Sequence, residues 1–371
     1  MKIGYDAKRA FNNRSGLGNY SRDVIRAMIR KGKDELFLFT PRVNTELFTV
    51  DETVQKIMPE KSIEKLFKSY WRSFSMVSQI KKLGLDIFHG LSNEIPANVP
   101  APTKTIITVH DLIFKRFPQW YPYFDRKVYD KKVGYGVNHA DKIIAISQQT
   151  KQDIIDFYPV DESKIEVVYQ TCNDIFKKKA LPEAIKKVRE KYNLPSAFLL
   201  YVGTIEPRKN ALNIVKAIHR YKTDIPLVLI GRSTPYADKI KQYIRENGLE
   251  NQVMIFHNVA TEELPVFYQE AEIFIYPSLF EGFGIPIIEA LYSGTPVITT
   301  KYGCFTEAGG NHSVYINPND VDELADAIKT LLHDQEKRAL MRNKGLEFVK
   351  KFDTEKVTDD LYKVYLSLVG H

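Results

Sequence analysis

Short hydrophobic runs alternate with longer amphipathic segments along most of the chain. The runs are rich in β-branched and aromatic residues and end at glycine, proline or polar residues, which is typical of buried strands. Between them, apolar residues recur three and four positions apart, which predicts helices. This alternation indicates an α/β protein with parallel, doubly wound sheets. The predicted strands are residues 2–6, 35–40, 86–89, 104–109, 141–146, 164–169, 197–202, 226–230, 252–256, 273–275, 295–300 and 314–316.

A break in this periodicity divides the chain. The alternation lapses over residues 170–181, which predicts a linker, and a second series begins with a helix at 182–192. A length of 371 residues also suits two domains. We therefore predict an N-terminal α/β domain over residues 1–180 and a C-terminal one over 181–353.

Residues 60–82 have a helical period in which Leu66, Phe67 and Trp71 are interleaved with lysines. Two interpretations stay open for this segment. A basic, aromatic-bearing helix suits the surface of an anionic membrane. It equally suits a helix that faces the core with one side and presents a solvated basic side to water.

The segment from Ser278 to Thr300 combines a glycine loop with two carboxylates. Gly282, Phe283, Gly284 and Ile285 precede a first-turn proline, so the loop opens a helix whose N–H groups and dipole favour an anion. Glu281 lies in the loop and Glu289 about one turn into the helix. Carboxylates are strong acceptors for sugar hydroxyls.

Cations and a histidine follow other predicted strands. Arg208 and Lys209 come after a strand that ends at Gly203, and together they suit a diphosphate. His110 directly follows the strand 104–109, at the edge where parallel sheets bind ligands.

Gly16 and Gly18 open an N-terminal helix and form a flexible loop that can approach a phosphate. The GLGNYS string is a weak dinucleotide fingerprint, because Ser21 stands in place of the third glycine.

Composition narrows the function classes. A net charge of +7 permits an anionic partner, but no basic-aromatic motif indicates nucleic acid. Cys172 and Cys304 lack metal-ligand spacing, and Asp320-Val321-Asp322 is interpreted as a helix cap. The absence of a signal segment and of a long apolar run predicts a cytoplasmic protein.

The quoted residues resemble those of a known family. EGFGIPIIEALYSGTPVI, with Gly203-Thr204 and Arg208-Lys209 upstream, resembles the retaining glycosyltransferases of family 4. GLGNYS, VHDLIFKRFPQWYP and DKIIAISQQTKQDI resemble its bacterial mannosyltransferase-like members, so that the resemblance covers essentially the whole chain. It implies the GT-B fold, with two facing Rossmann-like domains and a final helix, here 354–371, that crosses back to the N-terminal domain.

The resemblance assigns most of the donor site to the C-terminal domain. It implies that Glu281 binds the hydroxyls of the donor sugar and Glu289 the ribose. Arg208 and Lys209 would neutralise the diphosphate, assisted by the backbone N–H groups of residues 282–285.

The same resemblance places further contacts around the donor. Gly16 and Gly18 would approach the diphosphate from the N-terminal domain, and His110 would lie beside the reacting carbon. Val259 would contact the base with its backbone, and Arg232 would flank the diphosphate.

The implied reaction is a metal-independent, retaining transfer of a hexose without a cofactor. GDP-mannose is the favoured donor and a UDP-sugar the alternative, and the acceptor is a saccharide or lipid-linked saccharide of surface polysaccharide synthesis. A nucleotide-sugar epimerase of the same fold and a non-enzymatic nucleotide-sugar-binding protein stay open. A dinucleotide-dependent oxidoreductase would require the intact GxGxxG motif that the chain lacks.

Overall fold

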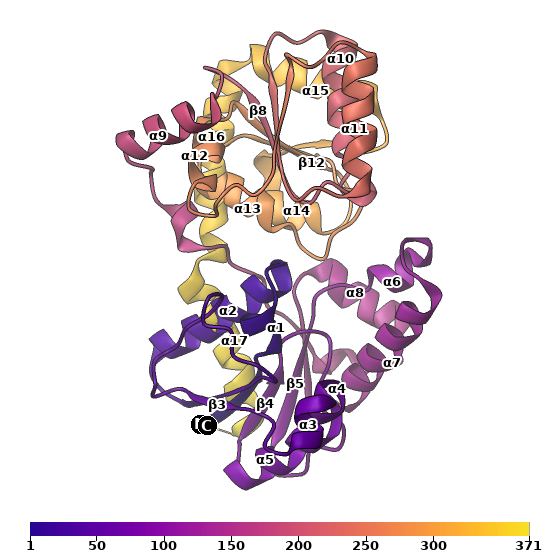
Figure 1. The fold of residues 1–371 in the computed structure, drawn as a ribbon, viewed down its shortest axis with the longest axis vertical. Coiled ribbons are helices and arrows are strands. Elements are labelled where there is room, and N and C mark those ends of the chain that lie inside the picture. The colour runs from indigo at the N-terminus through magenta and orange to yellow at the C-terminus, as the bar shows by residue number, and fades with distance from the viewer. Residues whose placement is uncertain (371) are drawn as a thin grey trace. The chain divides into compact units, whose positions relative to one another are not determined.

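The computed structural model describes residues 1–370, which form two compact units. Unit 1 contains residues 1–171 and the C-terminal segment from Asp353, and unit 2 contains residues 172–352. His371, the last residue of the predicted helix 354–371, lies outside the described residues. Each unit consists of a parallel sheet with helices packed on it (Figure 1).

Unit 1 is built on seven parallel strands. They are β1 (Lys2–Asp6), β2 (Glu35–Phe39), β3 (Gln55–Ile57), β4 (Ile87–Gly90), β5 (Lys104–Val109), β6 (Lys142–Ala145) and β7 (Ile165–Val167). Their order in the sheet is β3-β2-β1-β4-β5-β6-β7, and each pair of neighbours is parallel.

The α-helices of unit 1 cover both faces of this sheet (Figure 1). They are α1 (Lys8–Asn12), α2 (Gly16–Lys31), α3 (Ser62–Leu66), α4 (Lys68–Tyr70), α5 (Met76–Leu83), α6 (Ile113–Arg116), α7 (Tyr123–His139), α8 (Gln148–Phe157) and α17 (Thr354–Val369). Short 3-10 turns lie at Pro118–Trp120 and Glu162–Lys164.

The two-residue period of the strands divides the core of unit 1 between these faces. In β2, Leu36 and Leu38 belong to the hydrophobic cluster that includes residues of α2 and α17. Phe37 and Phe39 belong to a different cluster, around Trp71. A strand that buries both faces requires helices on both sides.

The segment predicted as one helix over residues 60–82 is interrupted. It consists of α3, α4, a π-helical turn at Trp71–Ser75 and α5. The wider turn allows the consecutive residues Trp71 and Arg72 both to be buried, and Arg72 pairs with Asp6 and Glu94. The sequence pattern also did not predict β3 or α1.

Unit 2 is built on six parallel strands. They are β8 (Leu199–Val202), β9 (Leu227–Ile230), β10 (Val253–Phe256), β11 (Ile273–Tyr276), β12 (Val297–Thr300) and β13 (Val314–Ile316). Their order is β10-β9-β8-β11-β12-β13, and each pair of neighbours is parallel. All residues of β8, β9, β11 and β12 are buried, as expected for strands covered on both faces.

The helices of unit 2 precede, separate or follow these strands in the chain. They are α9 (Pro182–Tyr192), α10 (Ala211–Tyr221), α11 (Pro235–Glu246), α12 (Leu264–Glu270), α13 (Ile285–Tyr292), α14 (Cys304–Gly309), α15 (Val321–His333) and α16 (Gln335–Val349). Short 3-10 turns lie at Asp174–Lys177, Pro207–Lys209, Gly310–His312 and Lys350–Phe352.

The C-terminal helix returns to unit 1, as predicted. Leu361, Val364 and Tyr365 of α17 are buried in the same hydrophobic cluster as residues of β1 and α2. The chain thus has the two-sheet GT-B architecture with the returning helix that the sequence predicted.

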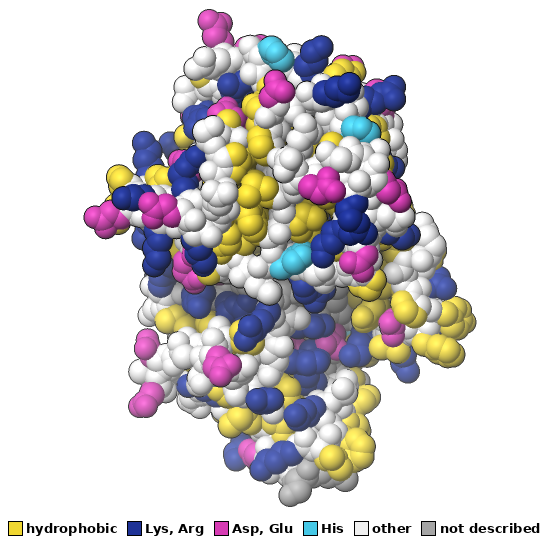
Figure 2. Space-filling view, turned by 45° about the horizontal axis from the view of Figure 1, so that its top comes forward, with side chains coloured by type: hydrophobic (Ala, Val, Ile, Leu, Met, Phe, Trp, Pro, Cys, Tyr) yellow, Lys and Arg dark blue, Asp and Glu magenta, His cyan; other side chains and the backbone are white. Residues whose placement is uncertain are grey.

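The surface of unit 1 exposes large hydrophobic side chains in two segments. Figure 2 shows hydrophobic side chains next to lysine and arginine side chains at the right-hand edge of the view. The exposed residues are Met58, Leu66, Phe67, Tyr70 and Phe74 in one segment, and Tyr123, Phe124, Val128 and Tyr129 in the other.

Candidate active site

Four neighbouring strands of unit 2 end at one edge of the sheet, and most of the predicted site residues follow those ends. Because β10, β9, β8 and β11 are adjacent and parallel, the loops that follow them lie side by side. These loops carry Val259 after β10, Arg232 after β9, Gly203, Arg208 and Lys209 after β8, and Glu281 to Gly284 after β11. The structure therefore brings these residues together at one edge.

The carboxylate of Glu281 is the centre of a charged cluster at this edge. Its Oε2 lies 2.9 Å from Nη1 of Arg208, and its Oε1 lies 3.3 Å from Nζ of Lys209. Oε1 also accepts hydrogen bonds from the Tyr276 hydroxyl at 2.8 Å and from Ser278 Oγ at 3.1 Å. The Glu281 side chain is 15% exposed, so a ligand can still reach it.

The charges in this cluster stabilise one another. Burial by itself would raise the pKa of Glu281, but Lys209 and Arg208, together with hydrogen bonds from Arg208 and Tyr276, lower it to about 2. Burial would lower the pKa of Arg208, but Glu281 and Glu206 raise it. At neutral pH the site therefore contains an ionised carboxylate held by two cations.

Arg208 also joins the loops after β8 and β11. Its Nη2 lies 2.7 Å from Oε1 of Glu206, and its Nη1 donates to the carbonyl of Phe280. In return, its own carbonyl accepts a hydrogen bond from the N–H of Leu279 at 2.8 Å. These contacts fix the guanidinium in relation to the glycine loop.

Tyr276 and Ser278 are site contacts that the sequence analysis did not identify. Tyr276 is the last residue of β11 and lies one position beyond the predicted strand 273–275. The signal in the sequence is a hydroxyl-bearing residue at a strand end, a few positions before a loop carboxylate.

The glycine loop adopts a backbone conformation that requires glycine. Gly284 has φ +121°, which side chains disfavour, and its carbonyl accepts a hydrogen bond from Ile287 N at 2.9 Å. Pro286 occupies the first turn of α13, where a missing N–H costs nothing. The Phe283 ring is buried against Phe352, with centroids 5.3 Å apart, so Phe283 offers a ligand its backbone only.

A second close contact involves the loops after β8 and β9. A Cβ atom at Gly231 would lie 1.8 Å from the carbonyl oxygen of Gly203, so a side chain at Gly231 would force these loops apart. Arg232 follows directly with an exposed side chain, and its carbonyl accepts a hydrogen bond from Ile205 N at 3.2 Å.

Glu289 and Val259 occupy the remaining positions of the predicted donor site in unit 2. Glu289 lies on α13, is half-buried and accepts a hydrogen bond from the Tyr268 hydroxyl at 2.9 Å. Val259 is half-buried in the loop after β10.

The remaining predicted site residues belong to unit 1. Gly16 begins α2, and a side chain there would meet open space. Gly18 is different, because a Cβ atom would lie 2.0 Å from the carbonyl oxygen of Asn13. Gly18 therefore lets the first turn of α2 pack closely against the preceding loop.

His110 follows β5, and both nitrogens of its ring have partners. Nε2 lies 2.9 Å from the carbonyl of Leu91, and Nδ1 lies 3.3 Å from Nε2 of Gln170. The ring packs edge-on against Tyr20, with centroids 4.7 Å apart. Burial lowers the pKa of His110 to about 4, so the imidazole is neutral at pH 7.

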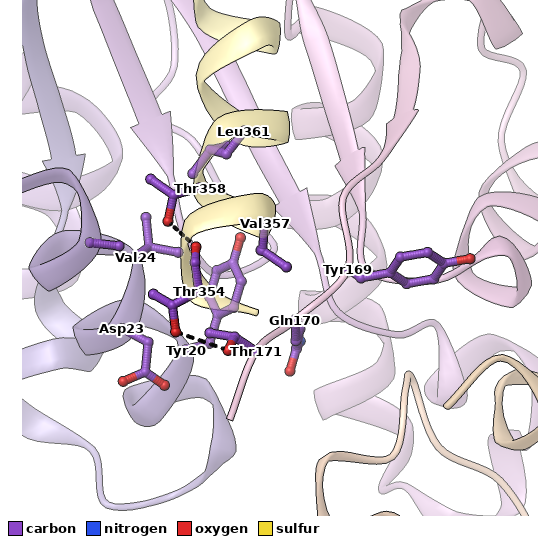
Figure 3. A pocket seen from close by; sticks show the side chains of 11 residues that line it. Tyr20, Asp23, Val24, Tyr169, Gln170, Thr171, Thr354, Val357, Thr358 and Leu361 are labelled. Carbon is purple, nitrogen blue, oxygen red and sulfur yellow. Dashed lines mark hydrogen bonds between the residues drawn. The ribbon is translucent and has the colours of Figure 1, made fainter. Parts of the chain in front are cut away.

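A small, mostly apolar pocket adjoins this histidine in unit 1 (Figure 3). Tyr20 and Gln170, which contact His110, lie in its wall, and Thr171 Oγ1 lies 3.2 Å from Thr354 Oγ1 beside them. The other lining residues come from α2 and α17, apart from Tyr169, which follows β7. None of the predicted site residues lines this pocket.

Neither a metal centre nor a membrane-spanning helix is found within residues 1–370. No group of three or more His, Cys, Asp or Glu side chains in this part of the chain could hold a metal ion. No helix in the same residues is long and apolar enough to cross a membrane.

Two family models match the chain. The model described as "Glycosyltransferase Family 4" matches residues 14–173, and that described as "Glycosyl transferases group 1" matches residues 184–348. The O-antigen chain mannosyltransferase RfbU of Salmonella typhimurium is 32% identical over 71% of this chain and 69% of its own. The O-antigen chain mannosyltransferase B of Escherichia coli is 28% identical over 75% of this chain and 74% of its own.

Solved structures share the fold. A glycosyltransferase from Rickettsia africae has a TM-score of 0.79 at 20% identity, covering 100% of this chain and 99% of its own. Alr3699/HepE from Anabaena, solved with UDP and glucose, has a TM-score of 0.78 at 19% identity, covering 99% of this chain and 100% of its own. At these identities the likeness establishes the fold and not the ligand.

Proposed function

Because the chain belongs to glycosyltransferase family 4, we propose that it transfers a hexose, with retention, from a nucleotide diphosphate sugar, GDP-mannose being the favoured donor. The observation that carries the proposal is the ionised Glu281, which lies between Arg208 and Lys209 at the start of the glycine loop. The names of the related O-antigen mannosyltransferases support mannose as the sugar. A UDP-sugar is the alternative donor.

Donor binding redistributes the charges of this cluster. In the structure Glu281 and Glu206 balance the charges of Arg208 and Lys209. A diphosphate that takes over the two cations leaves Glu281 free to accept hydrogen bonds from the sugar hydroxyls. The N–H groups at the start of α13 add further donors for the phosphate oxygens.

The reaction breaks the bond between the sugar carbon and the diphosphate oxygen, and negative charge develops on the leaving phosphate. Arg208 and Lys209 stabilise that charge from fixed positions, which is electrostatic preorganisation. The leaving phosphate oxygen takes the proton of the acceptor hydroxyl, and the new carbon–oxygen bond forms on the same face. Glu289 would hold the ribose, and the neutral imidazole of His110 would lie beside the sugar.

The acceptor in this proposal is a saccharide or a lipid-linked saccharide of surface polysaccharide synthesis, used at the cytoplasmic face of the membrane. Residues 61–82 would provide peripheral contact with that membrane. Leu66 and Phe67 are exposed there next to Lys65 and Lys68, a mixture that suits an anionic lipid surface.

A thermal-shift screen over UDP-, GDP-, ADP- and TDP-sugars, with and without EDTA, tests the donor. A ligand at 100 times its Kd stabilises the folded protein by about 2.7 kcal/mol, so the correct donor raises Tm. We expect GDP-mannose to give the largest shift and EDTA to leave it unchanged. If no nucleotide sugar raises Tm, the proposed function is wrong.

Turnover of the same donors separates the alternatives. We expect Arg208→Ala and Glu281→Ala to lower kcat about 10²-fold or more, because each removes a preorganised group. Arg220→Ala is the matched control, since Arg220 is an exposed cation of unit 2 paired with Asp322. Sugar conversion without any acceptor would indicate an epimerase, and binding without turnover a non-enzymatic binding protein.

A further inference from the structure

The N-terminal half of α7 exposes large apolar side chains. Phe124 is 80% exposed, and Tyr123 and Val128 are also more than half exposed. At about 100° per residue, Tyr123, Phe124, Lys127, Val128 and Lys131 fall within roughly 140° of one another. These five residues, called the α7 stripe below, form one outward side of the helix, while the other side packs into the core of unit 1.

The charge of the α7 stripe is positive. Lys127 and Lys131 form no ion pair within residues 1–370, and Nζ of Lys127 lies 5.6 Å from the centroid of the Tyr123 ring. The two acids of this helix segment flank the stripe: the exposed Asp125 lies about 60° beyond Val128, and Asp130 lies about 20° beyond Tyr123. Asp130 pairs with Lys115 at 2.7 Å and faces the protein.

We propose that the α7 stripe docks on an anionic phospholipid bilayer. Tyr123, Phe124 and Val128 would enter the headgroup region, and Lys127 and Lys131 would contact the lipid phosphates. Aromatic rings favour the boundary between water and lipid, and unpaired lysines complement its negative charge. The inference rests on the proposed transfer to a lipid-linked acceptor. It makes α7 a second membrane contact of unit 1, in addition to that proposed for residues 61–82 (Figure 1).

Flotation of the full chain with vesicles tests this docking. We expect binding to vesicles that contain phosphatidylglycerol and no binding to pure phosphatidylcholine. The double variant Tyr123→Ser/Phe124→Ser should weaken binding about tenfold or more. Lys127→Glu/Lys131→Glu should weaken it as well, by about fivefold or more for each lysine.

Matched variants keep the result interpretable. Leu181→Ser changes an apolar side chain of unit 2 that is 71% exposed, and it should bind vesicles like the wild type. All these variants should transfer sugar to a water-soluble acceptor at the wild-type rate. Vesicle binding that survives both α7 double variants, or that only Leu66→Ser/Phe67→Ser abolishes, overturns the assignment to α7. A wild type that transfers no sugar contradicts the proposed function instead.

A second, independent observation concerns Tyr276. Its hydroxyl accepts a hydrogen bond from Nζ of Lys209 at 2.8 Å and donates one to Oε1 of Glu281 at 2.8 Å. The ring is buried and lies nearly parallel to that of Tyr201, with centroids 6.1 Å apart. One oxygen atom therefore connects the ammonium and the carboxylate, and a packed ring holds it in place.

We infer that Tyr276 is a positioning residue that keeps Lys209 and Glu281 at the separation the donor requires. The inference uses the proposed roles of those two residues. Because the aromatic ring is fixed by packing at the end of β11, the hydroxyl can orient both partners before the donor arrives. Preorganisation of this kind contributes to the rate without a direct contact with the substrate.

The variant Tyr276→Phe removes the bridging oxygen and keeps the ring. We expect kcat to fall about tenfold and KM for the donor to change less, because the variant loses the preorganisation of Lys209 and Glu281 and no direct contact with the substrate. Tyr201→Phe is the matched control, since its hydroxyl donates to the carbonyl of Thr204 at 3.1 Å and not to Glu281. If the two variants have the same kcat and the same KM, the role of Tyr276 is structural only.

Discussion

The imidazole rings of His89 and His110 are both buried in unit 1, and all four ring nitrogens have partners. For His89 these are the hydroxyls of Tyr365 at 2.7 Å and Thr108 at 2.8 Å. Burial lowers the pKa of His89 to about 3 and that of His110 to about 4. Both rings are therefore neutral in the folded protein at pH 7.

The low pKa values of these histidines predict a loss of stability in mild acid. The unfolded chain binds protons below about pH 6.5, whereas the folded rings do not until about pH 4 or lower. The stabilisation that comes from keeping these two rings neutral is complete above pH 6.5 and is lost as the pH falls toward 4. Its size is on the order of 3 kcal/mol for His110.

Urea unfolding at several pH values, followed by tryptophan fluorescence, measures this loss. Trp71 and Trp120 are the two tryptophans of the chain and both belong to unit 1, so the signal reports that unit. We expect His110→Gln to flatten the pH dependence between 6.5 and 4. His333→Gln, at an exposed position in unit 2, should leave it unchanged, and an equal effect of both variants would contradict the argument.

At the scale of elements, the cap of α15 confirms the interpretation of Asp320-Val321-Asp322 as a helix start. The Asp320 carboxylate accepts hydrogen bonds from the N–H groups of Asp322 at 3.0 Å and Glu323 at 2.9 Å. An acid at this position satisfies two orphan donors and favours the helix dipole. The local sequence was sufficient here because the partners are two and three residues away.

The variant Asp320→Ala should lower the free energy of unfolding by about 1 kcal/mol, because it removes this cap. The variant Asp322→Ala keeps the cap and removes a first-turn acid with its exposed pair to Arg220, each of which contributes about 0–1 kcal/mol. Chemical denaturation followed by circular dichroism measures both. A larger loss for Asp322→Ala would show that the Asp320 side chain does not act as the cap.

At the scale of the whole molecule, α17 completes unit 1 from the far end of the sequence. Leu361 and Tyr365 are buried among residues of β1 and α2. The Tyr365 hydroxyl lies 2.7 Å from Nδ1 of His89 and 3.2 Å from the Tyr5 hydroxyl. The folding of unit 1 therefore depends on residues that follow all of unit 2 in the chain.

The variant Tyr365→Phe should destabilise unit 1 by about 1–3 kcal/mol, because it leaves a buried ring nitrogen of His89 without its partner. Tryptophan fluorescence in urea again reports unit 1 selectively. Tyr362→Phe is the control, since its hydroxyl makes only a 3.5 Å contact with Asp34 at a half-buried position. Equal shifts of the unfolding midpoint for the two variants would contradict the role of the His89 contact.

The sequence by itself determined the α/β class, most strand positions, the cap of α15 and the glycine loop before α13. These features depend on period, capping and backbone freedom, which act between residues close in the chain. It also indicated Glu281, Arg208 and Lys209 as site residues, because charged residues and glycines follow the ends of predicted strands.

Only the tertiary structure decided how those residues combine. The order β10-β9-β8-β11 brings Arg208 and Lys209 to a carboxylate about seventy positions away and lowers its pKa. The tertiary structure also revealed the bridging hydroxyl of Tyr276 and the π-helical turn within residues 60–82. Such features depend on which strands and helices become neighbours, and hydrophobic periodicity contains no information on that choice.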